Sequence, residues 1–201
     1  MFVARILYPV RVLGPGERIG IWFAGCPRRC PGCSNPELWE AAPRYRTTAD
    51  TVMTLVNGIA AQKPVDGFTL TGGDPFAQPE TLAELLPRLR EVAGDILVYT
   101  GYRREELSAH SKILSQISVL IDGPYIEERN HNCRLRGSDN QEIHILEDAL
   151  RAKYETYLRE NGNQIQNFMT GGGVISVGIH RPGYREEFRA ALAKKGLLAD
   201  D

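Results

Sequence analysis

Three of the four cysteines of this chain, Cys26, Cys30 and Cys33, lie within eight residues of one another with the spacing C-x3-C-x2-C. The prolines and glycines between and around them exclude a continuous helix or strand, so a loop presents the thiols. Thiolates at this spacing can converge on one soft metal centre. Three of them leave a four-iron cluster with one iron that lacks a protein ligand, and a small molecule can bind at such an open iron.

Other functions of the cysteines have to be weighed against this one. Cys30-Pro31-Gly32-Cys33 could form a thioredoxin-like redox pair, but that assignment leaves Cys26 unused. A structural zinc site normally has four ligands, and the four histidines show no metal-binding spacing. Chance clustering is the third alternative. We expect Cys133, which lies a hundred residues further along the chain, to be a plain thiol rather than a fourth ligand.

Four apolar runs of strand length precede the polar residues that could act with the cysteines. The cysteine loop follows the first run, and Gly72-Gly73-Asp74-Pro75 follows the second. In α/β sheets and barrels, ligands bind at the carboxyl ends of the parallel strands. We therefore expect these strand ends to form the rim of an active site. The four predicted strands are 19–24, 67–71, 95–100 and 117–121, and the last of them stops at Asp122-Gly123-Pro124.

Helical patterns separate these strands. Thr47–Asp50 resembles a capping box, a second helix opens at Pro79 and closes at Gly94, and a polar helix covers about Arg103–His110. Strands alternating with helices predict right-handed parallel crossovers, and hence an α/β sheet or partial barrel. After an irregular stretch, the pattern predicts a helix over Glu147–Glu160, then Gly171-Gly172-Gly173. A strand over 174–177 and an amphipathic helix over 184–195 follow, with Phe188 and Leu192 on a side suited to docking onto the domain.

Length and composition favour one ordinary globular domain. The chain has 201 residues, of which 42% are hydrophobic and 24% charged, and its net charge is −1. This balance provides no broad electrostatic surface for nucleic acid or membrane, so we expect neither as a partner. The first twelve residues are interrupted by Arg5, Pro9 and Arg11, so they predict neither a signal peptide nor a transmembrane helix. Unpaired, clustered cysteines favour metal chemistry in the cytoplasm over disulfides.

The cysteine loop and the segment Thr71–Pro75 together resemble the radical S-adenosylmethionine superfamily, whose cluster motif is C-x3-C-x2-C. The resemblance is closer to the activating proteins of anaerobic ribonucleotide reductase, and it extends from about residue 8 to residue 146. It rests on motifs that occur in the same order: Tyr8-Pro9-Val10, Gly14-Pro15-Gly16, Cys30-Pro31-Gly32-Cys33, Tyr99-Thr100-Gly101-Tyr102, Leu120-Ile121-Asp122-Gly123 and Arg136-Gly137-Ser138-Asp139-Asn140-Gln141.

This resemblance implies two cofactors and a set of residues that bind them. A [4Fe-4S] cluster would be held by Cys26, Cys30 and Cys33, and S-adenosylmethionine would chelate the open iron through its amino and carboxylate groups. The family pattern places further residues near S-adenosylmethionine: Gly72, Gly73 and Asp74 near the methionine amino group, Asp122 near the methionine moiety, and Ser138 with Asn140 near the ribose or carboxylate. Each of these residues could also be a simple turn former or loop cap.

Asp74 stands where many members of the superfamily have glutamate. The shorter side chain leaves a backbone carbonyl as the alternative contact to the methionine amino group.

The sequence thus predicts a single-domain α/β protein, a partial (βα)6-type barrel with parallel strands. Its core would span about residues 8–146 and a C-terminal extension about 147–201, which either shapes partner access or completes the core. The resemblance implies an iron-sulfur activase that installs a glycyl radical on a large partner subunit, with anaerobic ribonucleotide reductase as the expected partner and flavodoxin or ferredoxin as the electron donor. The alternatives are a radical enzyme acting on a small molecule or peptide, and a non-catalytic iron-sulfur electron carrier.

Overall fold

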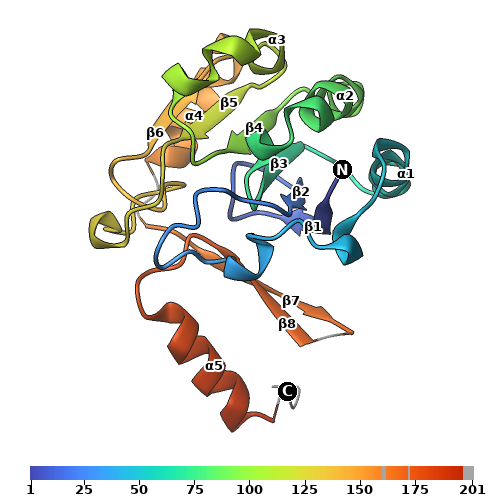
Figure 1. Ribbon diagram of the computed structural model, residues 1–201. Coiled ribbons are helices and arrows are strands. Elements are labelled where there is room, and N and C mark those ends of the chain that lie inside the picture. The colour runs from blue at the N-terminus through green and yellow to red at the C-terminus, as the bar shows by residue number, and fades with distance from the viewer. Residues whose placement is uncertain (160–161, 172, 197–201) are drawn as a thin grey trace.

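A six-stranded sheet in the order β1-β2-β3-β4-β5-β6 forms the centre of the computed structural model, which describes residues 1–159, 162–171 and 173–196 (Figure 1). Strands β2 to β5 are parallel, and β1 and β6 are antiparallel to their neighbours at the two edges. The strands are β1 (Val3–Val10), β2 (Arg18–Phe23), β3 (Gly67–Gly72), β4 (Ile96–Tyr99), β5 (Val119–Asp122) and β6 (Glu142–Ile145).

The α/β class and the four internal strands were predicted correctly, but the expectation of parallel strands throughout is wrong at both edges. A short turn joins β1 to β2, and the segment from β5 to β6 contains only one turn of 3-10 helix, Glu127–Arg129. A parallel connection needs a crossover of a dozen or more residues, usually an α-helix. The β1–β2 link is too short for one, and the β5–β6 link is long enough but contains no α-helix. Among the described residues no pairing joins β1 to β6, so the sheet is open.

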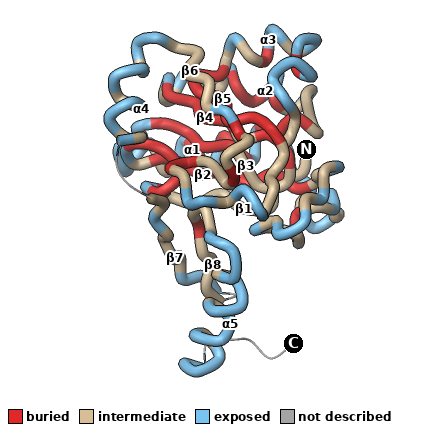
Figure 2. The backbone as a smooth tube through the Cα atoms, turned by 90° about the vertical axis from the view of Figure 1, so that its left-hand side faces the viewer, coloured by how far each residue is buried: buried red, intermediate tan, exposed pale blue. Residues whose placement is uncertain are grey.

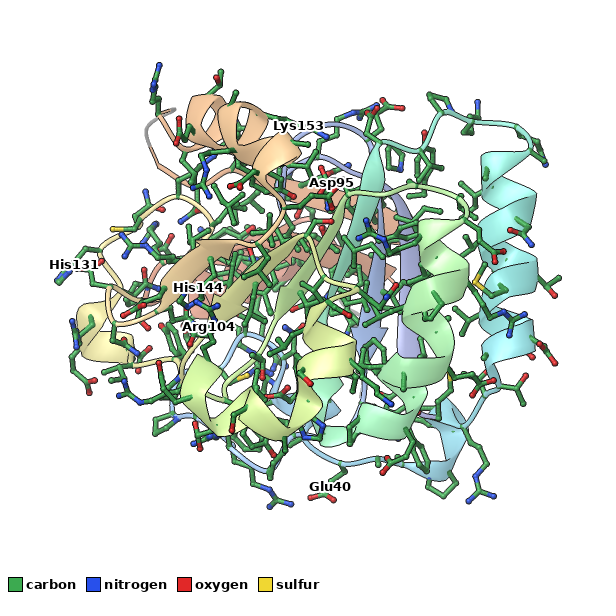
Figure 3. All side chains as sticks on the ribbon, turned by 90° about the horizontal axis from the view of Figure 1, so that it is seen from above. Glu40, Asp95, Arg104, His131, His144 and Lys153 are labelled. Atoms are coloured by element: carbon green, nitrogen blue, oxygen red, sulfur yellow. The ribbon has the colours of Figure 1, made fainter. Side chains whose placement is uncertain are left out.

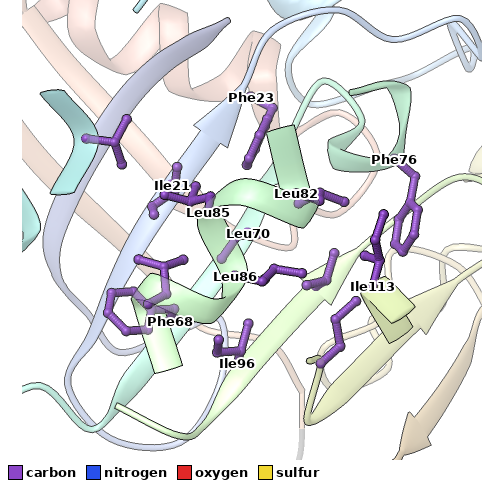
Figure 4. Close-up of a cluster of buried hydrophobic side chains, with 14 of the residues drawn as sticks. Ile21, Phe23, Phe68, Leu70, Phe76, Leu82, Leu85, Leu86, Ile96 and Ile113 are labelled. Atoms are coloured by element: carbon purple, nitrogen blue, oxygen red, sulfur yellow. The ribbon is translucent and has the colours of Figure 1, made fainter. Parts of the chain in front are cut away.

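Helices α1 (Ala49–Ala60), α2 (Pro79–Arg90) and α3 (Ser111–Leu114) cover one face of the sheet. Figure 4 shows Leu82, Leu85 and Leu86 of α2 packed over strand residues that include Leu70 and Ile96. The cap of α1 is Thr48, whose Oγ accepts a hydrogen bond of 3.1 Å from the Thr51 amide, rather than Thr47 as the predicted capping box implied. The predicted polar helix at 103–110 is instead a 3-10 helix, Arg104–His110, that leads into α3.

The C-terminal extension covers much of the opposite face. Successive strand residues point to opposite faces of a sheet. Leu97, Val119 and Ile121 therefore face away from α1 to α3, and they pack against the buried Tyr154 of α4 (Arg151–Leu158). Trp22 belongs to a separate apolar cluster with Val177 of the hairpin formed by β7 (Ile165–Thr170) and β8 (Gly173–Gly178). Helix α4 and the hairpin therefore contribute to the core of the protein.

The predicted helix over 147–160 is shorter than expected. It begins as a 3-10 turn, Asp148–Leu150, and α4 ends at Leu158. Its predicted end, Glu160, lies outside the described residues, as does Gly172 of the triple glycine.

Helix α5 (Tyr184–Lys194) forms where the sequence predicts, but it does not dock onto the sheet. None of its residues is buried, and Figure 2 shows it extending away from the body of the protein beyond the hairpin. Phe188 and Leu192 are only half-buried. None of the described helices has the length and apolar character needed to cross a membrane.

A buried charged network lies at the ends of the strands that are remote from the cysteines. Arg18 of β2 is fully buried, and it donates hydrogen bonds to Thr69 Oγ1 at 2.8 Å and to Asp95 Oδ1 at 3.0 Å. Asp95 also accepts from Lys153 Nζ at 2.7 Å and from the Tyr154 hydroxyl at 2.6 Å (Figure 3). The network joins two central strands to α4, so the extension is tied to the sheet by charge as well as by apolar packing.

Candidate cluster and cofactor site

The cysteine loop leaves the C-terminal end of β2 and is closed at its base by backbone hydrogen bonds. The Gly25 amide donates to Leu38 O at 2.8 Å, and the Cys26 amide donates to Trp39 O at 2.9 Å. Within the loop, the Cys33 amide donates to Cys30 O at 3.2 Å. The base is thus fixed to the body of the protein, while the cysteines lie in the irregular part that the sequence predicts.

All three predicted ligands, Cys26, Cys30 and Cys33, line one pocket of about 150 Å³. Cys133 lies elsewhere, and its thiol donates a hydrogen bond of 2.9 Å to Asp139 Oδ1. The structure therefore brings together the three cysteines that the spacing singled out and keeps the fourth apart.

The chemistry of this pocket fits a cationic group. Burial raises the pKa of the Cys26 and Cys33 thiols, although backbone N–H groups that point at the sulfurs oppose the shift. Thiolates are the metal-binding form, and a buried thiolate is disfavoured unless a cation compensates it. Three converging sulfurs are the donor set that iron-sulfur clusters use. The residues present therefore fit such a cluster.

The loop after β3 lies directly against the cysteine loop. Gly73 donates from its amide to Phe23 O at 2.7 Å, and Asp74 donates to Gly25 O at 2.9 Å. A Cβ atom on Gly73 would lie 2.5 Å from Gly25 O, and one on Gly72 would lie 2.5 Å from Phe23 O. Both residues line the cysteine pocket, but the space that a side chain would fill belongs to the protein backbone rather than to a cofactor.

The Asp74 carboxylate is held inside the protein and is 1% exposed. It accepts hydrogen bonds from the Gly101 amide at 2.8 Å, from Thr100 Oγ1 at 2.9 Å and from the Phe76 amide at 3.0 Å. Burial raises the pKa of Asp74 to about 6, against the lowering effect of these hydrogen bonds. The carboxylate thus ties the loop after β3 to Thr100 and Gly101, which follow β4.

Three predicted cofactor contacts lie outside the lining of the cysteine pocket. Asp122 accepts from the Arg104 amide at 2.6 Å and lies 3.2 Å from His144 Nε2, in the region where Figure 3 labels Arg104 and His144. Ser138 Oγ accepts from the Ile126 amide at 3.1 Å, and Asn140 Nδ2 donates to Pro124 O at 2.7 Å. The observed contacts of these residues are those of loop caps, which was the simpler interpretation of the sequence.

Several residues that the sequence analysis did not assign to the site also line the pocket. Gln141 is one of them, and its side chain fixes the surrounding loop by accepting from the Gly137 amide at 2.7 Å and donating to Gly123 O at 2.9 Å. The available signal was positional, since Thr100 and Gly101 end the next parallel strand. The unassigned residues of the lining are Arg28, Ser34, Trp39, Thr71, Tyr99, Thr100, Gly101, Gly123, Tyr125, Gly137, Gln141 and Ile179.

A second groove of about 310 Å³ runs beside the cysteine pocket, between the cysteine loop and the C-terminal extension. The two hollows share Cys33, Ser34 and Tyr125, so they are adjacent. The far wall carries stacked rings, with His180 and Tyr184 centroids 4.5 Å apart and Tyr184 and Phe188 centroids 5.6 Å apart. The extension therefore forms one side of the approach to the cysteines.

Comparison with known proteins agrees with this site. The family model described as "4Fe-4S single cluster domain" matches residues 12–144. The anaerobic ribonucleoside-triphosphate reductase-activating protein of Escherichia coli K12 is 31% identical over 150 residues, which cover 69% of this chain and 96% of the relative. The protein of the same name from Enterobacteria phage T4 is 34% identical over 142 residues, covering 68% and 90%.

A more distant relative has a related description. The pyruvate formate-lyase-activating enzyme of Staphylococcus aureus is 32% identical over 152 residues, which cover 68% of this chain and 57% of the relative. The chain described here belongs to the 4Fe-4S single cluster domain family and to the family of anaerobic ribonucleoside-triphosphate reductase-activating proteins.

Proposed function

We propose that this protein is a radical S-adenosylmethionine activase that generates a glycyl radical on the large subunit of an anaerobic ribonucleoside-triphosphate reductase. The observation that carries the proposal is the convergence of Cys26, Cys30 and Cys33 in one pocket, against the loop that ends β3. Family membership supports the same assignment. We place the reaction in the cytoplasm and propose flavodoxin or ferredoxin as the source of the electron.

Cys26, Cys30 and Cys33 would hold a [4Fe-4S] cluster whose fourth iron takes S-adenosylmethionine. When bound, the cluster supplies the electron that breaks the sulfonium bond, giving methionine and a 5′-deoxyadenosyl radical. The loop Gly72–Asp74 would line the methionine side, with backbone carbonyls rather than the Asp74 carboxylate available to its ammonium group. The Asp74 side chain would position this loop through Thr100 and Gly101.

Asp122, Ser138 and Asn140 would act on the cofactor through the backbone that they hold. Ser138 and Asn140 bond to Ile126 and Pro124, on either side of the pocket-lining Tyr125. The open sheet with antiparallel edges would serve as the partial barrel of this superfamily. Residues of the whole chain would form one domain, with a core of about 8–146 and an extension of about 147–201.

The extension would have two roles. Helix α4 and the hairpin complete the core, because Tyr154 and Val177 are buried against the sheet. Helix α5 would shape access, because it forms a wall of the groove that leads to Cys33 and has no buried residue of its own. A glycine-bearing segment of the partner would approach the cysteine pocket along this groove.

The test is anaerobic reconstitution with iron and sulfide, followed by reduction and addition of S-adenosylmethionine. We expect 5′-deoxyadenosine, and a glycyl-radical electron paramagnetic resonance signal when the organism's own anaerobic reductase subunit is present. Cofactor cleavage without any radical on that subunit would instead favour the enzyme that acts on a small molecule or peptide. A stable, reducible cluster without cleavage would favour the electron carrier.

A further inference from the structure

The indole N–H of Trp39 is a buried donor that the proposed cofactor chemistry has not yet used. Trp39 Nε1 is inaccessible to solvent and makes no hydrogen bond within the described part of the chain. An indole nitrogen can only donate, and a buried one normally finds an acceptor because an unsatisfied buried donor destabilises the fold. The site therefore lacks an acceptor that this nitrogen could use.

The backbone fixes Trp39 beside Cys33. Its carbonyl accepts from the Cys26 amide at 2.9 Å, and its own amide donates to Pro36 O at 3.2 Å. The preceding residue, Leu38, is fully buried in the apolar cluster that includes Trp22. Trp39 is thus anchored at the base of the cysteine loop, and it lines the same pocket as the three cysteines.

The sulfur of Cys33 is the acceptor within reach. Cys33 and Trp39 line the same pocket, and the indole N–H is close enough to act on the sulfur although no hydrogen bond of ordinary geometry joins them. The Asn35 amide lies 3.4 Å from Cys33 Sγ and already donates to it. A sulfur that binds iron as a thiolate is a stronger acceptor than a thiol and draws donors closer.

We infer that Trp39 donates an N–H···S hydrogen bond to the Cys33 thiolate in the cluster-bound protein and thereby raises the reduction potential of the cluster. The inference rests on the cluster ligation proposed above. One-electron reduction adds negative charge to the iron atoms and their sulfur ligands, so a donor at the sulfur stabilises the reduced form more than the oxidised form. Trp39 is accordingly a positioning and tuning residue, and it need not touch the substrate.

The chain offers a matched control, because it contains two tryptophans. Trp22 is 4% exposed and packs in the apolar cluster with Val177. Trp39→Phe removes the N–H and keeps an aromatic ring, while Trp22→Phe makes the same change at a residue that does not line the cysteine pocket. We expect equal iron content in both variants, a more negative midpoint potential in Trp39→Phe, and an unchanged potential in Trp22→Phe.

A spectroscopic measurement tests the hydrogen bond directly. Protein containing tryptophan labelled with ¹⁵N at the indole nitrogen is reduced with dithionite, and hyperfine couplings to the cluster are recorded by pulsed electron paramagnetic resonance. An indole ¹⁵N coupling is expected in the wild type and in Trp22→Phe, where Trp39 is the single remaining tryptophan. If Trp39→Phe assembles no cluster, these two spectra still decide the question.

Failure of this inference is distinct from failure of the proposed function. A wild-type protein with full iron content and normal cofactor cleavage but no indole coupling would overturn the role of Trp39 alone. An unchanged potential in Trp39→Phe would do the same. Absence of a cluster, or of cofactor cleavage by the wild type, would instead overturn the proposed function.

Discussion

The amide nitrogen of Asp74 donates a hydrogen bond of 2.9 Å to the carbonyl oxygen of Gly25. This contact joins the loop after β3 to the residue that precedes Cys26. It is reinforced by the neighbouring bond from Gly73 to Phe23 and, at the other end of Asp74, by the carboxylate contacts to Thr100 and Gly101. The position of the cysteine loop therefore depends on the ends of two further strands.

Removing any one of the three clustered cysteines is expected to abolish cofactor cleavage. Alanine at Cys26, Cys30 or Cys33 leaves the cluster with two protein ligands, whereas Cys133→Ala removes only a thiol bonded to Asp139. Iron content, the absorption spectrum and 5′-deoxyadenosine formation measure the effect. A cluster that disappears from Cys133→Ala alone would contradict the three-ligand assignment.

Gly73→Ala is expected to loosen the cysteine loop rather than simply to block the cofactor. The new methyl group would lie 2.5 Å from Gly25 O, and such overpacking costs about 1–3 kcal/mol of unfolding free energy. Iron content should fall together with stability. The control is Gly58→Ala, which meets open space in α1 and should stabilise the protein by up to about 1 kcal/mol. Unchanged stability and iron content with weakened cofactor binding would show that the glycine instead leaves space for the cofactor.

Asp74 is expected to make the fold less stable as pH rises from about 4 to about 6. Its pKa in the folded protein is raised to about 6 from its ordinary value of 3.8, so the folded state binds the proton more tightly than the unfolded chain does. The stabilisation that Asp74 contributes is fully present below its pKa in the unfolded chain, and it is lost as pH rises through its pKa in the folded protein. The loss amounts to about 3 kcal/mol at about 1.4 kcal/mol per pKa unit.

This pH dependence is measured by denaturant unfolding of the wild type and Asp74→Asn in the same cluster state, so that effects of pH on the cluster largely cancel. The stability of the wild type relative to the variant should decrease across this interval. A relative stability that stays constant or increases with pH would contradict the assigned shift.

Asp95→Ala is expected to destabilise the protein by about 3–5 kcal/mol, because it leaves the fully buried Arg18 without its ionic partner. Burial by itself raises the pKa of Asp95, but the charge of Arg18 and hydrogen bonds from Arg18, Lys153 and Tyr154 outweigh it, so the pKa lies below its usual value. Lys153→Met is the control, since this side chain is 37% exposed and its ion pair should contribute less than about 1 kcal/mol. Similar losses in both variants, measured by urea denaturation, would argue against a dominant Arg18–Asp95 pair.

Deleting residues 184–201 should leave folding and cofactor cleavage intact while weakening radical transfer to the partner. No residue of α5 is buried, yet this helix lines the groove beside Cys33. Truncation after Asn163 should be far more damaging, because it also removes the hairpin and uncovers Trp22, Val10 and Leu13. Thermal melting, iron content and glycyl-radical yield distinguish the effects of the two truncations. Normal radical yield from the shorter deletion would exclude a role of α5 in access.

The sequence by itself determined the features that depend on local pattern and spacing. The cysteine spacing singled out Cys26, Cys30 and Cys33, and the periodic apolar residues located the four internal strands and the helices α1, α2 and α5. Edge strands were harder to predict. The strand β1 is interrupted by Arg5 and Pro9, β6 alternates over only four residues, and β7 shows neither strict alternation nor a continuous apolar run.

Only the tertiary structure decided what the other site residues contact. Asp74, Asp122, Ser138 and Asn140 are polar residues in loops, and a pattern of polar residues is the same whether their partners are cofactor atoms or backbone groups from another strand end. Likewise, the hydrogen bond from Tyr154 to Asp95 and the burial of Trp39 Nε1 depend on how the chain is closed in space. Spacing along a chain predicts which groups can act together, but hydrogen-bond partners and burial arise only when distant segments pack.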